Sequence, residues 1–253
     1  MRRREFDTGN VSWPAVLVAI FGVVVVVVLG ILWRDFDQGE VDEGSPSSLR
    51  PSVSSTPAST SAIAATDGRV QPEVLLVGDG YAAGAGASDP GLSYASLLGS
   101  DLGWDVTVAA SVGAGYTRAG VDGRTVPELY AEAQPTTLKP DAVIVQSGYG
   151  GDFPDADVAD AIDALARQIR TDLPDVPLIV IGSLWPGPPT ELSARRDQTI
   201  ADAWQAQEDM LFLRPQEEGW ARMTIVRGGP DDAGHAQIAT NVEAALQGAG
   251  LTP

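Results

Sequence analysis

Cysteine is absent from the 253 residues, and histidine and lysine each occur only once. The lack of cysteine excludes disulfides, thiolate nucleophiles and cysteine-ligated metals. With a single histidine, metal ligands would have to be carboxylates such as Asp79, Asp152, Asp231 and Asp232, and we expect these aspartates to cap helices or turns instead. The sequence therefore predicts neither a metal site nor a cofactor.

Positive charge is scarce as well. The chain carries 16 basic against 34 acidic residues, a formal net charge of -18. Such a balance disfavours nucleic acid and anionic lipid surfaces as partners for the bulk of the protein. The hydrophobic fraction of 44% is enough for a real core, and the length suits one ordinary domain with additional segments.

Charge is missing altogether from residues 13–33, WPAVLVAIFGVVVVVVLGILW. At 1.5 Å per residue this stretch would extend about 31 Å as a helix, which matches the hydrocarbon core of a bilayer. Arginines stand at positions 2–4, whereas only Arg34 follows the stretch before an acidic run. The positive-inside rule then predicts a single-pass anchor in the cytoplasmic membrane, with residues 1–12 in the cytoplasm and the C-terminal domain extracytoplasmic. A buried core helix and a cleaved signal peptide are the alternatives, but the stretch is long for the latter and lacks a small-residue cleavage site.

Residues 34–70 combine acidic residues with a segment rich in serine, proline, threonine and alanine. No apolar period runs through it, so it cannot bury enough surface to offset the entropy of ordering. We expect a disordered linker, followed by a folded domain over residues 71–253.

Short apolar runs alternate with amphipathic stretches in this domain. The runs at 74–77, 105–110, 142–146, 178–182 and 211–213 predict strands. One helix is predicted from Val158 to Leu173, with Asp155 or Asp157 as N-cap, and another follows Asp231. Apolar strands separated by helices indicate a parallel sheet covered on both faces, a three-layer α/β/α domain. Ligands of such sheets bind at the carboxyl ends of the strands, where GDGY at 78–81, GAGY at 113–116 and SGYGGD at 147–152 are expected.

In order and spacing, residues 73–248 resemble the SGNH (GDSL-type) hydrolases, a family of serine esterases, lipases and acetyl-esterases with a flavodoxin-like fold. The family's first block ends in Gly-Asp-Ser with the serine as nucleophile; here it reads Gly78, Asp79, Gly80. Gly113 matches the glycine whose N–H contributes to the oxyanion hole. Gly150 takes the place of the oxyanion-hole asparagine.

The last family block, Asp-x-x-His-Pro, aligns with VRGGP at 226–230. This register puts Val226 at the aspartate and Gly229 at the histidine. The only histidine of the chain, His235, falls beyond the catalytic position at the start of the final helix, where a backbone carbonyl or solvent would satisfy it. Acyl transfer by serine needs a nucleophile, a base and oxyanion donors, so the resemblance implies a scaffold without its triad.

Three functions fit this pattern. The leading prediction is a membrane-anchored pseudoenzyme of the cell envelope that binds an unknown glycan, acyl or protein ligand. The second is an active envelope esterase or acyltransferase with a relocated nucleophile, for which Ser147 and His235 are the candidates. The third is a structural subunit of an envelope or secretion complex.

Overall fold

The computed structural model describes residues 54–55, 62–148, 151, 153–188, 190–220 and 223–252, all within one unit that spans Arg50–Pro253. Five parallel strands form its sheet: β2 (Glu73–Gly78), β3 (Asp105–Ala110), β4 (Ala142–Gln146), β5 (Leu178–Ile181) and β6 (Met210–Leu213). The short strand β1 (Ser54–Ser55) pairs antiparallel with β6. The five predicted strands are thus confirmed to within one residue at each end.

The strand order is β1-β6-β5-β4-β2-β3. Among the parallel strands the chain moves from β2 outward to β3 and then returns to β4 on the other side of β2, the doubly wound arrangement of flavodoxin-like domains. The order of strands therefore reverses between β2 and β4, and ligands of such sheets bind next to this point.

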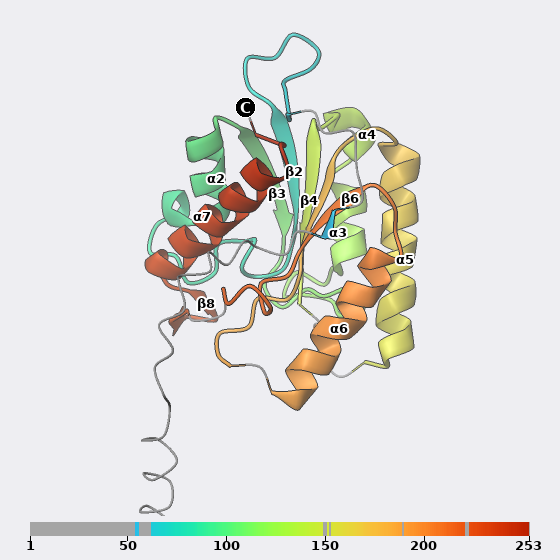
Figure 1. Cartoon of the computed structure of the whole chain (residues 1–253), viewed down its shortest axis with the longest axis vertical. Helices are drawn as coiled ribbons and strands as arrows, with labels where there is room; N and C mark the ends of the chain where they lie inside the picture. The colour runs from blue at the N-terminus through green and yellow to red at the C-terminus, as the bar shows by residue number, and fades with distance from the viewer. Residues whose placement is uncertain are drawn as a thin grey trace, which may run out of the picture. The chain divides into compact units, whose positions relative to one another are not determined.

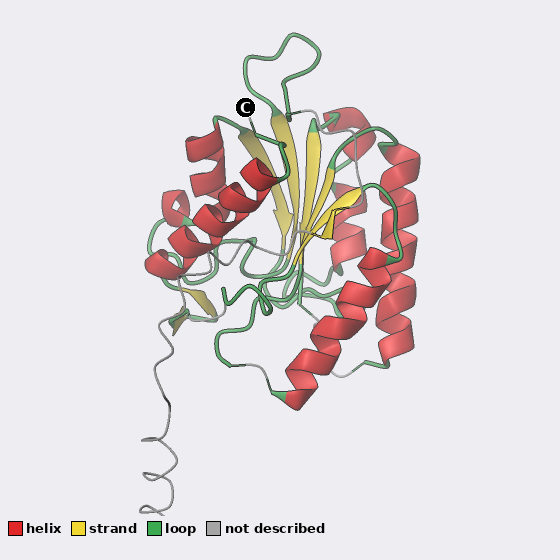
Figure 2. Ribbon diagram, in the orientation of Figure 1, coloured by secondary structure: helices red, strands yellow, loops and turns green. Residues whose placement is uncertain are grey.

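Helices cover both faces of the sheet (Figures 1 and 2). One face carries α2 (Tyr94–Leu102) and α7 (Asp232–Gly248), and the other carries α3 (Val126–Glu132), α5 (Asp155–Asp172) and α6 (Glu191–Gln205). Three smaller elements complete the domain: the 3-10 helix η1 (Pro90–Leu92), α4 (Pro135–Leu138), and a hairpin of β7 (Ile225–Val226) and β8 (Gly229–Pro230). The predicted three-layer α/β/α architecture is confirmed.

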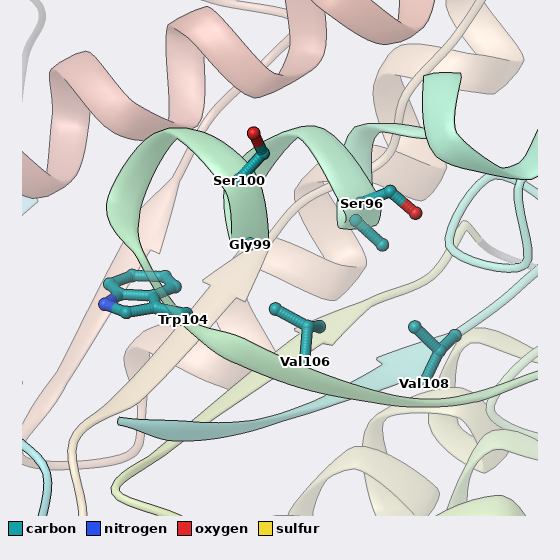
Figure 3. Close-up of a pocket in the computed structure, with 7 residues that line it drawn as sticks. Ser96, Gly99, Ser100, Trp104, Val106 and Val108 are labelled. Carbon is teal, nitrogen blue, oxygen red and sulfur yellow. The ribbon is translucent and has the colours of Figure 1, made fainter. Parts of the chain in front are cut away.

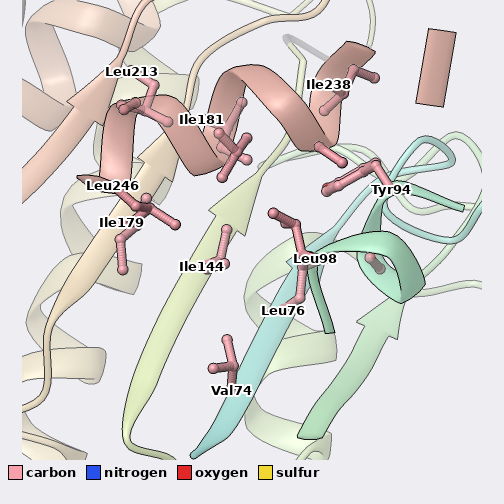
Figure 4. Packing of buried hydrophobic residues seen from close by; sticks show 14 of the residues in the cluster. Val74, Leu76, Tyr94, Leu98, Ile144, Ile179, Ile181, Leu213, Ile238 and Leu246 are labelled. Atoms are coloured by element: carbon pink, nitrogen blue, oxygen red, sulfur yellow. The ribbon is translucent and has the colours of Figure 1, made fainter. Parts of the chain in front are cut away.

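Each layer of the core follows from alternation along the strands. Val74 and Leu76 of β2 point toward α2 and α7, whereas Leu75 and Val77 point toward the opposite helices. Figure 4 shows the cluster on the face covered by α2 and α7, in which strand side chains meet Leu98 of α2. Burial of both strand faces explains why these strands are continuously apolar rather than alternating.

The N-cap was predicted correctly for one of the two helices and wrongly for the other. Asp231 is the N-cap of α7 and accepts a hydrogen bond from the Gly234 N–H (2.9 Å). Helix α5 has Pro154 at its N-cap without a side-chain hydrogen bond, and Asp155 and Asp157 lie inside the first turn. The predicted N-cap of α5 was therefore wrong, although both carboxylates still lie where the helix dipole favours negative charge.

The folded domain begins before residue 71, so the predicted linker 34–70 needs correction at its C-terminal part. Ile63 is buried and donates its N–H to the Leu251 carbonyl (3.0 Å). Asp141 accepts hydrogen bonds from the N–H and the hydroxyl of Thr66 and from Arg69. These contacts depend on partners distant in sequence, which composition alone does not reveal.

No helix within the described residues is long and apolar enough to span a bilayer. The predicted anchor at 13–33 and the N-terminal segment 1–12 lie outside the described residues.

Candidate functional site

The residues matched to the family's first and third blocks meet where the strand order reverses. Asp79 and Gly80 follow β2, and Ser147 and Gly148 follow β4, its neighbour in the sheet. Gly113 lies three residues beyond the end of β3, on the other side of β2. Gly150 and Asp152 lie outside the described residues.

The Asp79 carboxylate joins the ends of β2 and β4. Its Oδ1 accepts the Tyr81 N–H (2.9 Å), and its Oδ2 accepts the Gly148 N–H (3.0 Å) and the Gln146 side-chain amide (3.2 Å). Burial raises the pKa of Asp79, and these hydrogen bonds oppose that effect in part. These hydrogen bonds hold the turn after β2, which is the structural role expected for this aspartate.

Gly80 is buried but leaves room for a side chain. An ideal Cβ there would lie 3.4 Å from the Cα of Val112 and 3.6 Å from the Cβ of Ala85, which are ordinary contacts. Its backbone is not in the left-handed region, so a side chain would bring no conformational strain. Nothing steric in the structure therefore requires glycine at this position.

Gly113 lies on an exposed loop with φ of +79°, and a Cβ there would meet nothing within 4 Å. The loop is closed on itself, because Ser111 donates its hydroxyl to Asp122 (2.6 Å) and the Val121 N–H donates to the Val112 carbonyl (2.9 Å). The Ser111 hydroxyl lowers the pKa of Asp122. The glycine here is explained by its positive φ.

Gly229 differs from Gly80 because its side-chain space is filled. A Cβ at Gly229 would overlap the carbonyl group of Ala85 and approach the Ala85 Cβ to 2.9 Å. Gly86 is equally confined, since its Cβ would lie 2.6 Å from the Gly229 carbonyl carbon. Val226, opposite Gly229 in the hairpin, is 38% exposed.

Residues 83–88, which we call the strap, are held against the C-terminal block by side chains from two elements. Asp232 at the start of α7 accepts hydrogen bonds from the Ser88 N–H (2.7 Å) and hydroxyl (2.6 Å). Arg227, in the turn of the hairpin, donates to the carbonyls of Gly86 (3.3 Å) and Ala87 (2.9 Å). The strap thus runs between the family nucleophile position and the family base position.

His235 is fully buried and both of its ring nitrogens are engaged. Nε2 lies 3.0 Å from the Ala85 carbonyl oxygen, to which it must donate, and Nδ1 accepts the Tyr94 N–H (3.2 Å). The ring also stacks on Tyr94. Burial lowers the pKa of His235, which favours the neutral form with the proton on Nε2.

Ser147 is fully buried and donates its hydroxyl to the Gly148 carbonyl (3.0 Å). Among the described residues no hydrogen bond joins Ser147 to His235. A general base needs a free acceptor nitrogen within reach of the nucleophile. The Nδ1 of His235 already accepts from a backbone N–H, and its Nε2 already carries the proton.

The strap contacts escaped the sequence analysis. The segment AGAGAS at 83–88 carries no motif that points to a partner distant in sequence. A signal was present, because paired glycines at 86 and 229 permit two backbones to approach closely, but their separation in sequence hides the pairing. Within the described residues no group of three or more histidine, aspartate or glutamate side chains is placed to hold a metal ion.

Comparisons with known proteins agree with the fold. Residues 76–210 match the GDSL-like Lipase/Acylhydrolase family. No functionally curated protein matches the sequence. Several solved structures share the fold. A family two carbohydrate esterase from Clostridium thermocellum, solved with cellohexaose, is 14% identical over 70% of this chain and 64% of its own, with a TM-score of 0.55.

Two further structures have the same TM-score of 0.55. A carbohydrate esterase family 2 enzyme with a carbohydrate-binding domain, from Corynascus thermopiles (Myceliophthora fergusii), is 21% identical over 76% of this chain and 68% of its own. A protein of Lactobacillus plantarum is 19% identical over 71% of this chain and 99% of its own. The chain therefore spans just under two thirds of the Clostridium enzyme and nearly the whole of the Lactobacillus protein. Fold and family comparison together define an SGNH hydrolase-like domain, and this chain belongs to the GDSL-like lipase/acylhydrolase family.

Proposed function

We propose that this protein is a membrane-anchored pseudoenzyme of the cell envelope, an SGNH hydrolase-like domain that binds a ligand or partner without turning it over. One observation carries the proposal: the carbonyl group of Ala85 occupies the space that a histidine side chain at position 229 would need. A nucleophile restored at position 80 would therefore still lack a base.

The remaining residues support the same function. Gly80 offers no hydroxyl, and the two ring nitrogens of His235 are committed to backbone groups. Loss of any triad member costs several orders of magnitude in rate, and loss of all leaves only weak stabilisation by the remaining donors.

The surroundings of the former nucleophile favour an apolar or neutral ligand. Val112 lies against Gly80 and is 42% exposed, and Val226 at the hairpin is 38% exposed. Such aliphatic side chains suit an acyl chain, the apolar face of a sugar ring or a loop of a partner protein. The uncharged stretch at 13–33 would hold the domain outside the cytoplasmic membrane by the positive-inside rule.

The test uses the full chain purified in detergent. We expect no hydrolysis of p-nitrophenyl acetate above that of the Ser147→Ala/His235→Gln double variant, and no covalent labelling by a fluorophosphonate. Labelling that disappears in Ser147→Ala would overturn the proposal and assign a relocated nucleophile. The binding role is tested by calorimetry with cellohexaose, the glycan bound by the Clostridium enzyme. Heat of binding that Val112→Asp abolishes is expected for a glycan ligand, and its absence would direct the search to acyl or protein ligands.

A further inference from the structure

The two edges of the sheet differ in whether a further strand covers them. At one edge β6 is covered by β1, which the chain supplies itself. At the other edge β3 has β2 as its only strand neighbour among the described residues. Figure 1 shows β3 at the margin of the sheet, beneath α2.

The backbone groups that β3 directs outward can be assigned from its hydrogen bonds. The Asp105 N–H donates to Pro72 and the Ser111 N–H donates to Gly78, so both point toward β2. Because direction alternates along a strand, the N–H and C=O groups of Val106, Val108 and Ala110 point away from β2, toward the open edge.

This edge lacks the features that usually protect an edge strand. Natural edges carry lysine, proline, bulges or inward-pointing charges that prevent pairing with another chain. The sequence of β3, DVTVAA, has one charge, at its first residue. Val108 is 43% exposed, so an apolar β-branched side chain lies in solvent at the centre of the strand.

A groove runs alongside the same edge. It has a volume of about 310 Å³ and is lined by small or apolar residues of α2, of β3 and of the connection between them: Ala95, Ser96, Gly99, Ser100, Trp104, Val106 and Val108. Figure 3 shows the side chains of Val106 and Val108 directed from β3 toward α2. Val106 and Val108 therefore both direct their backbone groups toward the open edge and line the groove with their side chains.

Gly99 lies where α2 packs most closely on the start of β3. A Cβ there would lie 3.2 Å from the Trp104 carbonyl oxygen and 3.3 Å from Val106 Cγ2. The missing side chain at Gly99 therefore lets α2 approach β3 closely.

The negative charge near the groove favours a cationic segment as its occupant. Residues 90–117 contain two exposed acidic side chains, Asp101 and Asp105, and no basic residue. The C-terminal end of α2, at Leu102, adds the negative end of its dipole at the same place. A second copy of this chain would bring the same negative charge to the edge, whereas a cationic segment would complement it.

We propose that β3 and the α2–β3 groove form a docking site for an extended, lysine- or arginine-containing segment of a partner protein, which adds to the sheet as a further strand. Its backbone pairs with Val106, Val108 and Ala110, and its alternate apolar side chains enter the groove. This surface lies on the sheet edge and does not depend on whether the family site is inactive.

Fluorescence anisotropy of labelled heptapeptides with the full chain in detergent tests the proposal. A peptide of alternating lysine and valine is the probe, and a peptide of alternating glutamate and valine is the charge control.

Two further probes carry backbone N-methyl groups, one on its valines and the other on its lysines. Each methylation removes the backbone donors on one side of the strand without changing the charge. We expect one of these two to bind about tenfold more weakly than the other, because a strand pairs through one side only. Loss with methylated valines indicates antiparallel addition, and loss with methylated lysines indicates parallel addition.

A matched pair of variants separates pairing from general attraction. Val108→Lys should lower the affinity for the lysine–valine peptide about tenfold. Val121→Lys, at a position that is 81% exposed, should leave that affinity unchanged. Equal affinity for the two N-methylated peptides, or equal weakening by both variants, would overturn the proposal in favour of unspecific charge attraction. A dimer in sedimentation that Val108→Lys dissociates would assign the edge to a second copy and overturn it as well.

Discussion

Ala85 and Gly229 lie so close that the carbonyl group of one fills the side-chain space of the other. The strap residue Ala85 also lies next to Gly80, at 3.6 Å from the position of a Cβ there. One small residue thus separates the two positions that hold the nucleophile and the base in the family's catalytic members. In the proposed pseudoenzyme, the difference from the family's catalytic arrangement therefore lies in the backbone as well as in the side chains.

This relationship predicts opposite outcomes for two glycine substitutions. Gly80→Ala should change the free energy of unfolding by less than about 1 kcal/mol, because a side chain fits without strain. Gly229→Ala should lower it by about 1–3 kcal/mol or more, because its Cβ meets a backbone carbonyl that cannot rotate away. Urea unfolding of the two variants measures the difference. Equal destabilisation would show that the strap yields easily.

Much of the fold could be predicted because its signals are local. Runs such as AVIVQ at 142–146 are short and β-rich, and the spacing from Val158 to Leu173 is helical, so elements and architecture followed. The exposure of β3 did not follow, because its place at the margin of the sheet depends on strand order, which DVTVAA does not encode.

The candidate site could be predicted in position but not in content. The motif at 78–80 and the turn after β4 were correctly expected at one rim of the sheet, since parallel strands end together. The strap could not be anticipated, because the contact between Ala85 and Gly229 joins residues far apart in sequence and involves backbone atoms rather than distinctive side chains.

Restoring the family side chains should not produce esterase activity, because the strap fills the position of the base. A variant combining Gly80→Ser, Gly150→Asn, Val226→Asp and Gly229→His is expected to show no ester hydrolysis above wild type and no fluorophosphonate labelling. The imidazole cannot enter its position while the Ala85 carbonyl occupies it. Labelling of the serine at position 80 in a folded variant would contradict this explanation and show that the strap can move aside.

Acidification should destabilise the protein through His235. Burial lowers its pKa below the ordinary value of 6.5, so below that pH the unfolded chain binds a proton that the folded chain does not. The free energy of unfolding should therefore fall as the pH drops below 6.5 toward the lowered pKa, and stay level above it. Asp231 and Asp232 oppose the effect but do not cancel it.

The control is His235→Gln, whose side chain can accept from Tyr94 and donate to Ala85 without titrating. Urea unfolding at a series of pH values should give a steeper loss for wild type than for this variant. Parallel curves would mean that the imidazole gains its proton in the folded state at no cost.

Asp79 should contribute to stability because its carboxylate accepts three hydrogen bonds that join the ends of β2 and β4. Asp79→Ala leaves the N–H groups of Tyr81 and Gly148 and the amide of Gln146 without their acceptor. An unsatisfied buried polar group costs about 1–3 kcal/mol. Because these hydrogen bonds are part-buried, we expect a loss in the unfolding free energy toward the lower end of that range for each donor. Asp101→Ala removes the same group from an exposed position of α2 and should change stability little. Similar values for both variants would show that water replaces the carboxylate.

Two buried tyrosines provide a matched test of what a hydroxyl contributes to this core. The Tyr116 hydroxyl accepts the Trp204 Nε1–H at 3.0 Å, and the two rings pack edge to face. The Tyr94 hydroxyl is buried and has no hydrogen-bond partner in the part of the chain that the structure describes. Tyr116→Phe strands a buried donor and should cost about 1–3 kcal/mol, whereas Tyr94→Phe removes a group that has already lost its water and should be neutral or stabilising. Thermal unfolding of the two variants decides the matter, and a larger loss for Tyr94→Phe would reveal that its hydroxyl has a partner after all.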